Sequence, residues 1–372
     1  MNAKGFSLLE VLVAMTITVT ITAAVLAVIS PSQGIAVRQP EFADMQQRLR
    51  AGVDVLRHDL LMAGAGSYTG VQSGSLVGFF APVMPYSRGA SASRDDGPGV
   101  FRTDAVTVVY VPSTASQTTL RIPMADASTA DVSAEAGCPV NDFACGFGPG
   151  VSAAVYDSTG AFDVFSVTNA GPGGLLTLQH LQRGPLATTY AAGTKIVEIV
   201  RRTYFFDAAA KQLMRDDGGT ASYAALENVA GLTFEYYGDP EPPAFSRPGT
   251  ARSVTYGPSP PPLDVSQAPW PPGENCTWQV VAGGQTPRLL SLGSAGELIR
   301  LTSGQLADGP WCPHSASENR FDADLLRIRK IRVSIRVQAG NPLLRAARSV
   351  VRAVPDQSVQ FDVVPRNMNL SR

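Results

Sequence analysis

An unbroken apolar stretch begins almost at the first residue and constrains the fold more than any other feature of the sequence. From Phe6 to Ile29 the only ionisable side chain is that of Glu10. As a helix this stretch would be about 36 Å long, at about 1.5 Å per residue, whereas the hydrocarbon core of a bilayer is about 30 Å thick. It is therefore long enough to cross a membrane. Lys4 is the only charged side chain before it, which favours a cytoplasmic amino terminus.

Glu10 makes this stretch unusual, because an acid at the centre of a membrane helix costs about 2.5–3.5 kcal/mol. A secretory signal would have a shorter apolar region and a small-residue cleavage site after it. A plain signal anchor fits the length but leaves the carboxylate unexplained. A carboxylate near the membrane interface could also reach water. Length and polarity alone leave these alternatives open.

The residues that surround Glu10 supply a further interpretation. The segment "KGFSLLE" at residues 4–10, followed directly by the apolar run, resembles the class III signal of type IV prepilins and type II secretion pseudopilins. The resemblance implies that prepilin peptidase cleaves between Gly5 and Phe6 and methylates the new amino terminus at Phe6. It also implies that Glu10 pairs with the terminal amine of a neighbouring subunit and sets the register of a subunit entering the fibre.

A second helical segment follows the apolar stretch. Pro31 and Pro40 predict a kink or a short unwound stretch, because proline removes a backbone donor. Beyond them, apolar residues recur at steps of three or four and form one stripe of a helix that would pack on the body. Gly64 and Gly66 predict its C-cap. The stripe consists of Phe42, Met45, Leu49, Val53, Leu56, Leu60 and Ala63.

The end of this helix carries a second resemblance. The segment "LRHDLLMAGAGSY" at residues 56–68 resembles the "L-x-x-D-L-x-x-A-G-Y/F" ending of the same helix in PilW-type minor pilins, with the J-type pseudopilins of type II secretion as near relatives. The matching residues are Asp59, Leu60, Ala63 and Gly64. The aromatic residue of the pattern is displaced to Tyr68.

The rest of the chain is rich in short segments with strand periodicity. "VSAAVYD" and "FDVFSV" predict one hairpin, and "KIVEIVRRTYFFD" with "KQLMRDD" predicts another. In "IRKIRVSIRVQ" the alternation is strict, with Ile331, Val333, Ile335 and Val337 on one face. These patterns predict an α+β fold, in which a long amino-terminal helix packs on an antiparallel sheet. Their order also resembles the body of PilW-type proteins.

The four cysteines lie in regions that exceed a minimal pilin body. Cys138 and Cys145 lie in a Gly/Ser/Pro-rich region, and Cys276 and Cys312 lie in a Pro-rich insertion at residues 238–325. Four cysteines allow three pairings; if the body is exported, the simplest is Cys138–Cys145 with Cys276–Cys312. The rival interpretation is a metal site, although no C-x-x-C spacing is present. The insertion is either a surface that binds partners or ligands, or a looped-out region that packs around a small core of its own.

No pattern of residues indicates catalysis or a cofactor. His58, His180 and His314 are each isolated, and the sequence has no G-x-S-x-G, H-E-x-x-H or Walker motif. Asp322 and Asp324 are too few to claim a calcium site and fit a charged helix start. The formal net charge of −1 provides no overall basic field for nucleic acid, although nucleic-acid binding stays open.

The sequence predicts a membrane-anchored pilus subunit in four parts. They are a leader at residues 1–5, a membrane and assembly helix at 6–29, an amphipathic half-helix at 30–66 and a β-rich body at 67–372. The resemblance implies a minor pilin that primes or caps the tip of a type IV pilus. The alternatives are a type II secretion pseudopilin, or a tip adhesin or DNA-uptake module that uses the insertion.

The same resemblance implies the partners and the location. The expected partners are prepilin peptidase, other minor and major pilins, the inner-membrane assembly platform and, before assembly, membrane lipid. The expected location is the bacterial inner membrane, with the body in the periplasm or outside, and afterwards the fibre.

Overall fold

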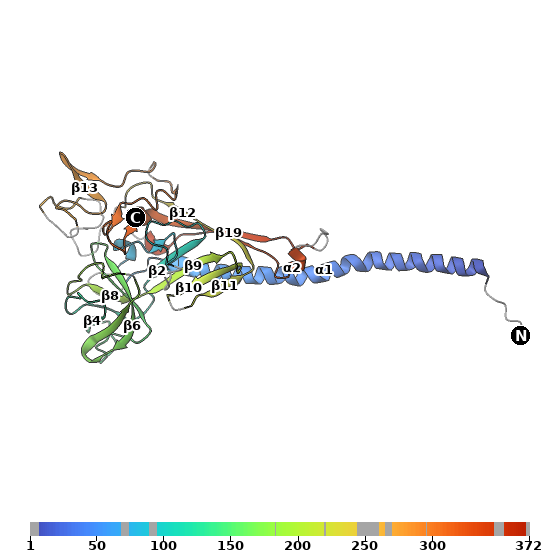
Figure 1. Ribbon diagram of the computed structural model, residues 1–372, viewed down its shortest axis with the longest axis horizontal. Helices are drawn as coiled ribbons and strands as arrows, with labels where there is room; N and C mark the ends of the chain where they lie inside the picture. The colour runs from blue at the N-terminus through green and yellow to red at the C-terminus, as the bar shows by residue number, and fades with distance from the viewer. Residues whose placement is uncertain are drawn as a thin grey trace.

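A long helix that leaves the body on one side dominates the computed structural model (Figure 1). Helix α1 (Leu8–Met62) runs from the amino-terminal end into the body, so that its first half projects alone and its second half lies against strands. The body consists of antiparallel sheets, and the fold is α+β. The structure describes residues 7–67, 74–88, 95–182, 184–218, 221–243, 260–264, 270–294, 296–345 and 353–369, with the backbone alone for 30–37.

The apolar stripe of α1 fixes its packed half. Leu49 and Val53 are partly buried against the core of the body, whereas Phe42, near the edge of the packed half, is 37% exposed. The helix ends ahead of Gly64, which adopts a φ of +79°. Glycine takes this conformation at little cost and commonly stops a helix. The fully buried members of the stripe are Met45, Leu56, Leu60 and Ala63.

Helix α1 is continuous through Pro31 and Pro40, so the prediction of a short unwound stretch is wrong. Each proline removes only one backbone donor, and the backbone around both keeps its helical conformation. The helix therefore tolerates both prolines without an interruption of its helical backbone. The apolar half and the packed half form one element.

Helix α1 contacts a five-stranded antiparallel sheet. In spatial order its strands are β1 (Val83–Met84), β2 (Ala105–Tyr110), β9 (Val200–Asp207), β10 (Gln212–Asp216) and β11 (Tyr223–Glu227). Strands β9 and β10 form a predicted hairpin. Gly52 allows α1 to approach β11 closely, because a Cβ at this position would lie 3.1 Å from the side chain of Leu226.

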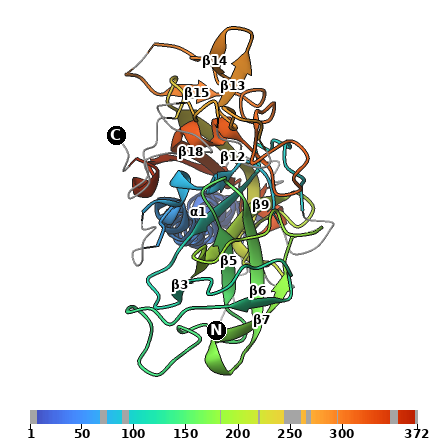
Figure 2. The ribbon, with the colours of Figure 1, turned by 90° about the vertical axis from the view of Figure 1, so that its left-hand side faces the viewer.

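A four-stranded antiparallel sheet lies on another side of α1 (Figure 2). In spatial order its strands are β15 (Ile299–Leu301), β12 (Val229–Gly238), β18 (Ile328–Val337) and β19 (Gln357–Val363). The alternation predicted for β18 is confirmed, since all four of its predicted apolar residues are buried. On the outer face Arg332 of β18 pairs with Asp362 of β19, with 2.7 Å between nitrogen and oxygen. The main core lies between α1 and the two sheets.

A six-stranded antiparallel sheet forms a lobe with a core of its own. In spatial order its strands are β3 (Gln117–Thr119), β8 (Lys195–Glu198), β5 (Ser152–Tyr156), β6 (Phe162–Ala170), β7 (Leu175–His180) and β4 (Thr129–Asp131). Strands β5 and β6 form the other predicted hairpin. The segment predicted as one strand from Lys195 to Asp207 is divided, because the chain changes sheets at Ile199. In the described residues, the single predicted sheet is therefore replaced by three larger sheets and two strand pairs.

The Pro-rich insertion extends the body at the end farthest from the amino terminus (Figure 1). Seen along α1, the insertion and the six-stranded lobe lie on opposite sides of the helix (Figure 2). Two small strand pairs belong to it, β13 (Trp278–Val281) with β14 (Gly284–Pro287) and β16 (Trp311–Cys312) with β17 (Phe321–Asp322). The short helices of the body are η1 (Leu76–Gly78), η2 (Pro172–Gly174), η3 (Ala323–Arg327), α2 (Pro342–Arg345) and η4 (Arg366–Met368).

Candidate functional sites

Glu10 helps to close the first turn of α1. The Ser7 hydroxyl accepts a hydrogen bond from the Glu10 backbone N–H at 3.1 Å, and the Glu10 carboxylate accepts one from the Ser7 N–H at 3.0 Å. This reciprocal arrangement is a capping box. It places the carboxylate at the helix amino terminus, where the helix dipole favours a negative charge. Gly5 and Phe6, the predicted processing residues, lie outside the described residues.

Apart from Glu10, the apolar half of α1 has no polar side chain that needs a hydrogen-bond partner outside the helix. The span from Leu8 to Ile29 is long and apolar enough to cross a membrane, and none of it is buried against the body. Its threonines donate their hydroxyl protons to carbonyl oxygens one turn earlier in the helix, at 2.7–2.9 Å. A helix that is apolar on every face is unstable in water and suits lipid or the centre of a helical bundle.

Residues 1–26 match the family described as the prokaryotic N-terminal methylation motif. The chain carries a type IV prepilin-like class III signal. Such a signal implies processing by a prepilin peptidase and assembly with other pilins, and it agrees with an inner-membrane anchor and a pilus fibre. No curated protein and no solved structure matches the chain. The matched residues end within the apolar half of α1, so the PilW-type resemblance of the body stays a proposal.

Asp59 joins the last turn of α1 to the five-stranded sheet. Its side chain is buried, and its two carboxylate oxygens accept hydrogen bonds from the hydroxyls of Tyr110 in β2 at 2.9 Å and Tyr204 in β9 at 2.6 Å. Burial, followed by the charge of Asp59, raises the pKa of both tyrosines, so that both hydroxyls keep their protons. The acid of the helix-end motif therefore has a structural role at the joint between helix and body.

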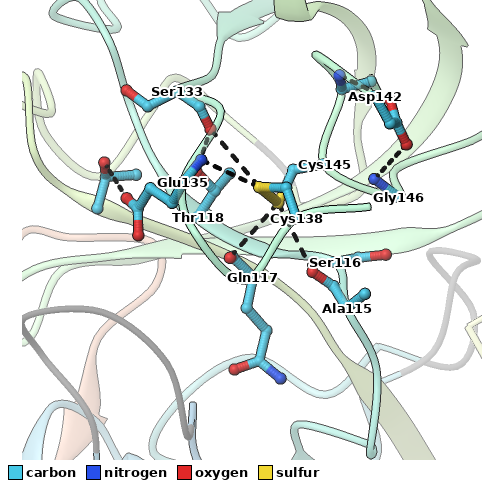
Figure 3. Close-up of a disulfide and its surroundings, with 12 residues drawn as sticks. Ala115, Ser116, Gln117, Thr118, Ser133, Glu135, Cys138, Asp142, Cys145 and Gly146 are labelled. Carbon is cyan, nitrogen blue, oxygen red and sulfur yellow. Dashed lines mark hydrogen bonds between the residues drawn. A yellow bond between two sulfur atoms is a disulfide. The ribbon is translucent and has the colours of Figure 1, made fainter. Parts of the chain in front are cut away.

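The Cys138–Cys145 disulfide fastens a surface loop to the six-stranded lobe (Figure 3). The Cys145 sulfur lies 3.7 Å from the carbonyl oxygen of Gln117 in β3. Cys145 has a φ of +54°, and the Asp142 carboxylate holds the turn by accepting the Gly146 N–H at 2.7 Å. This bond closes a loop with a sequence separation of 7 residues, which in the chain-entropy model stabilises the fold by about 2–3 kcal/mol.

The second disulfide, Cys276–Cys312, lies within the insertion. Both residues are fully buried, and their Cα atoms are 5.4 Å apart, within the usual range for a disulfide. The bond links two cysteines that are 36 positions apart in the chain. The structure thus contains the simplest of the three pairings that the sequence allows.

A buried carboxylate that the sequence did not reveal joins the six-stranded lobe to the insertion. Asp163 in β6 is fully buried and accepts four hydrogen bonds. The donors are His180 Nε2 at 2.9 Å, Asn319 Nδ2 at 2.7 Å, the Ala187 N–H at 2.8 Å and the Tyr190 hydroxyl at 2.6 Å. His180, isolated in the sequence, therefore belongs to a buried network. Four donors saturate this carboxylate, which indicates a structural role.

Asp322 and Asp324 take different partners at the start of η3. The Asp322 side chain is the N-cap and accepts the Asp324 N–H at 2.7 Å, whereas Asp324 pairs with the buried guanidinium of Arg327. This confirms the prediction of a charged helix start. Among the residues that the structure describes, no group of three or more His, Cys, Asp or Glu side chains is arranged to hold a metal.

The burial of Asp322 predicts that the insertion loses stability as the pH rises. Burial raises the pKa of Asp322 to about 7, above the value of about 3.9 for an unfolded aspartate. Between these values the folded state binds a proton that the unfolded state lacks, so the free energy of unfolding falls with increasing pH. We expect a loss of about 2–3 kcal/mol between pH 5 and pH 8. Urea unfolding followed by tryptophan fluorescence measures it, because Trp270, Trp278 and Trp311 all lie in the insertion.

A matched variant isolates this contribution from those of other groups. Asp322→Asn cannot ionise, so its stability should change less between pH 5 and pH 8 than that of the natural protein. Equal slopes for the two proteins would contradict the role of Asp322.

Proposed function

We propose that the protein is a minor pilin that takes part in the assembly of a type IV pilus. The observation that carries the proposal is the class III signal at the start of a helix whose apolar half is exposed on every face. In the membrane this half would be held by lipid, and after processing it would pack among the helices of other minor and major pilins. The inner-membrane assembly platform would move the subunit from the first environment to the second.

The shape of the body supports a place at or near the fibre tip. The insertion and the six-stranded lobe extend from opposite sides of the helix axis at the distal end (Figure 2). Inside a fibre, this end would face the body of a subunit stacked above it. A subunit at the tip has no such neighbour, so the tip accommodates both extensions. In this position the protein would prime or cap assembly.

The nearest alternative is a pseudopilin of a type II secretion system, which uses the same signal. Deleting the chain in its native host separates the two. Loss of surface fibres with normal secretion supports the pilus, whereas loss of secreted enzymes with normal fibres supports the secretion system. The insertion also permits a second role in binding, which concerns a different part of the molecule.

The role of Glu10 in assembly predicts a large effect of removing its charge. Glu10→Gln should still enter the membrane and be processed to an amino terminus at Phe6, because glutamine can also complete a capping box. Without a carboxylate it cannot pair with the terminal amine of a neighbouring subunit. We expect incorporation into fibres to fall about tenfold or more, corresponding to about 1.4 kcal/mol or more for a charge-assisted hydrogen bond. Sheared fibres probed by immunoblotting measure incorporation.

Ser7→Ala is the matched control for Glu10→Gln. It removes the hydroxyl that accepts the Glu10 N–H but retains the carboxylate. Normal incorporation of Ser7→Ala beside poor incorporation of Glu10→Gln supports pairing between subunits. Equal losses would instead assign the effect to the start of the helix. The mass of the mature amino terminus, expected to match N-methylated Phe6, verifies processing in both variants.

A further inference from the structure

The insertion contains a groove lined by two segments of the chain, which we call its two walls. Its volume is about 440 Å³, within the range of small-molecule sites. One wall carries Trp270, Glu274 and Arg288, and the other carries Pro310, Trp311 and His314. The Cys276–Cys312 disulfide joins the segments that form the two walls. The bond therefore fixes one tryptophan-bearing wall relative to the other.

The polar groups of the first wall are held in place by one another. The guanidinium of Arg288 lies 5.1 Å from the centre of the Trp270 ring, and it forms an ion pair with Glu274. Its Nε atom also donates to the carbonyl oxygens of Asn275 and Trp278, both at 3.0 Å. Because each group is already oriented, a ligand would meet a preorganised surface, which lowers the entropic cost of binding.

The second wall adds an aromatic ring and a neutral donor. The guanidinium of Arg320 lies 5.3 Å from the centre of the Trp311 ring. His314 Nδ1 accepts the Ala316 N–H at 3.2 Å, which leaves the imidazole proton on Nε2. Burial lowers the pKa of His314, so the ring is neutral at pH 7. The wall thus combines an apolar face with a hydrogen-bond donor that carries no charge.

The charges around the groove restrict the class of ligand. A cationic ligand is disfavoured, because the guanidinium near each tryptophan ring would repel a second positive charge. A free anion gains little, because Glu274 neutralises Arg288. A purely apolar ligand would form no hydrogen bond with Glu274, Arg288 or His314. The combination fits a neutral ring with an apolar face and a rim of hydroxyl groups, which can both stack on an indole and exchange hydrogen bonds.

We propose that this groove binds a saccharide, with one or both tryptophans stacking on the sugar ring. Glu274 and Arg288 would contact hydroxyl groups from the first wall, and His314 would donate to one from the second. The insertion that contains the groove lies at the end of the body farthest from the amino terminus (Figure 1). Binding therefore goes beyond the assembly role and does not depend on it, and a subunit at a fibre tip would present the groove outward.

Binding can be tested with the full chain in detergent micelles. The probes are an array of defined neutral and acidic oligosaccharides, with a proline-rich decapeptide as the competing ligand class. Hits are titrated by tryptophan fluorescence. We expect saturable binding of a neutral oligosaccharide, weakened about tenfold or more by Trp270→Ala or Trp311→Ala, as for a buried aromatic contact. Trp311→Phe should retain more affinity than Trp311→Ala, because phenylalanine still offers a ring.

Trp278→Phe is the matched control, since Trp278 lies in the insertion but does not line the groove. It should bind as the natural protein does. Near-ultraviolet circular dichroism and the mass of the intact disulfide verify that each variant is folded. The proposal is overturned if no saccharide of the array binds, if the peptide binds instead, or if saccharide binding survives both alanine variants. None of these outcomes would bear on fibre assembly.

Discussion

Replacing Asp59 by alanine is expected to destabilise the body by about 2–6 kcal/mol. The substitution leaves the hydroxyls of Tyr110 and Tyr204 without their acceptor, and a buried hydroxyl left unpaired costs about 1–3 kcal/mol. Both tyrosines are buried, so water cannot readily replace the carboxylate. Urea unfolding of the full chain in micelles, followed by circular dichroism, measures the loss.

Removing the orphaned hydroxyls should then recover part of the stability. In the Asp59→Ala background, Tyr110→Phe and Tyr204→Phe remove groups that no longer have a partner, so the triple variant should be more stable than Asp59→Ala alone. In the natural background the same tyrosine changes should be destabilising. This reversal of sign is the signature of coupled partners. Additive effects would contradict the hydrogen-bonded joint between helix and sheet.

The joint also explains why an acid stands near the end of an otherwise apolar helix face. Gly64 donates its N–H to the Val109 carbonyl oxygen at 3.0 Å, and Val111 donates to the Ala65 carbonyl oxygen at 2.7 Å. Asp59 adds side-chain bonds to these backbone bonds. The end of α1 is thus fixed to β2 at three points. Any displacement of the helix on assembly would be transmitted to the sheet at this place.

Local sequence patterns predicted much of the fold because they depend on near neighbours. The stripe from Met45 to Ala63 is a helix because its period of 3.6 matches one buried face. Strand β18 is a strand because its alternation matches two faces of a sheet. The processing signal was found in the same way, since it is contiguous in the chain. These features need no knowledge of distant segments.

Other features depend on which distant segments meet, and no local pattern encodes that choice. The sequence from Lys195 to Asp207 has one continuous strand pattern, yet it serves two sheets. Trp270 lines the groove although Trp278, closer to Cys276 in the chain, does not. Asn319 donates to a residue 156 positions away. Asp163 can be recognised as a buried, hydrogen-bonded acid only once its neighbours in the fold are known.

Asp163→Ala is expected to have an effect as large as that of Asp59→Ala, and to act on two parts of the body at once. It leaves four donors without their acceptor, one of them from the insertion. Removing a buried, fully bonded carboxylate costs about 3–5 kcal/mol. We expect the six-stranded lobe to lose protection from hydrogen exchange. Because the variant also removes the acceptor of Asn319, tryptophan fluorescence of the insertion should change over a different range of urea than the unfolding of the lobe.

Two further variants separate the contribution of the link from that of the lobe. Asn319→Ala removes only the donor from the insertion, and should cost about 1–3 kcal/mol while it uncouples the fluorescence change from hydrogen exchange in the lobe. Asp131→Ala is a control in the same sheet. It breaks a pair with Arg121, whose side chain is 55% exposed, so it should cost only about 0.2–1 kcal/mol.

The pattern across these variants decides whether the lobe and the insertion form one cooperative unit. If they do, the two probes report one transition in the natural protein, and both Asp163→Ala and Asn319→Ala, which break the same hydrogen bond, separate it into two. If the two probes still report one transition in Asn319→Ala, the hydrogen bond from Asn319 carries no coupling. A cooperative unit would hold the groove in a fixed position relative to α1, because the lobe packs on the core that also contains the helix. Uncoupling by Asn319→Ala would then leave helix and lobe in place and free only the insertion.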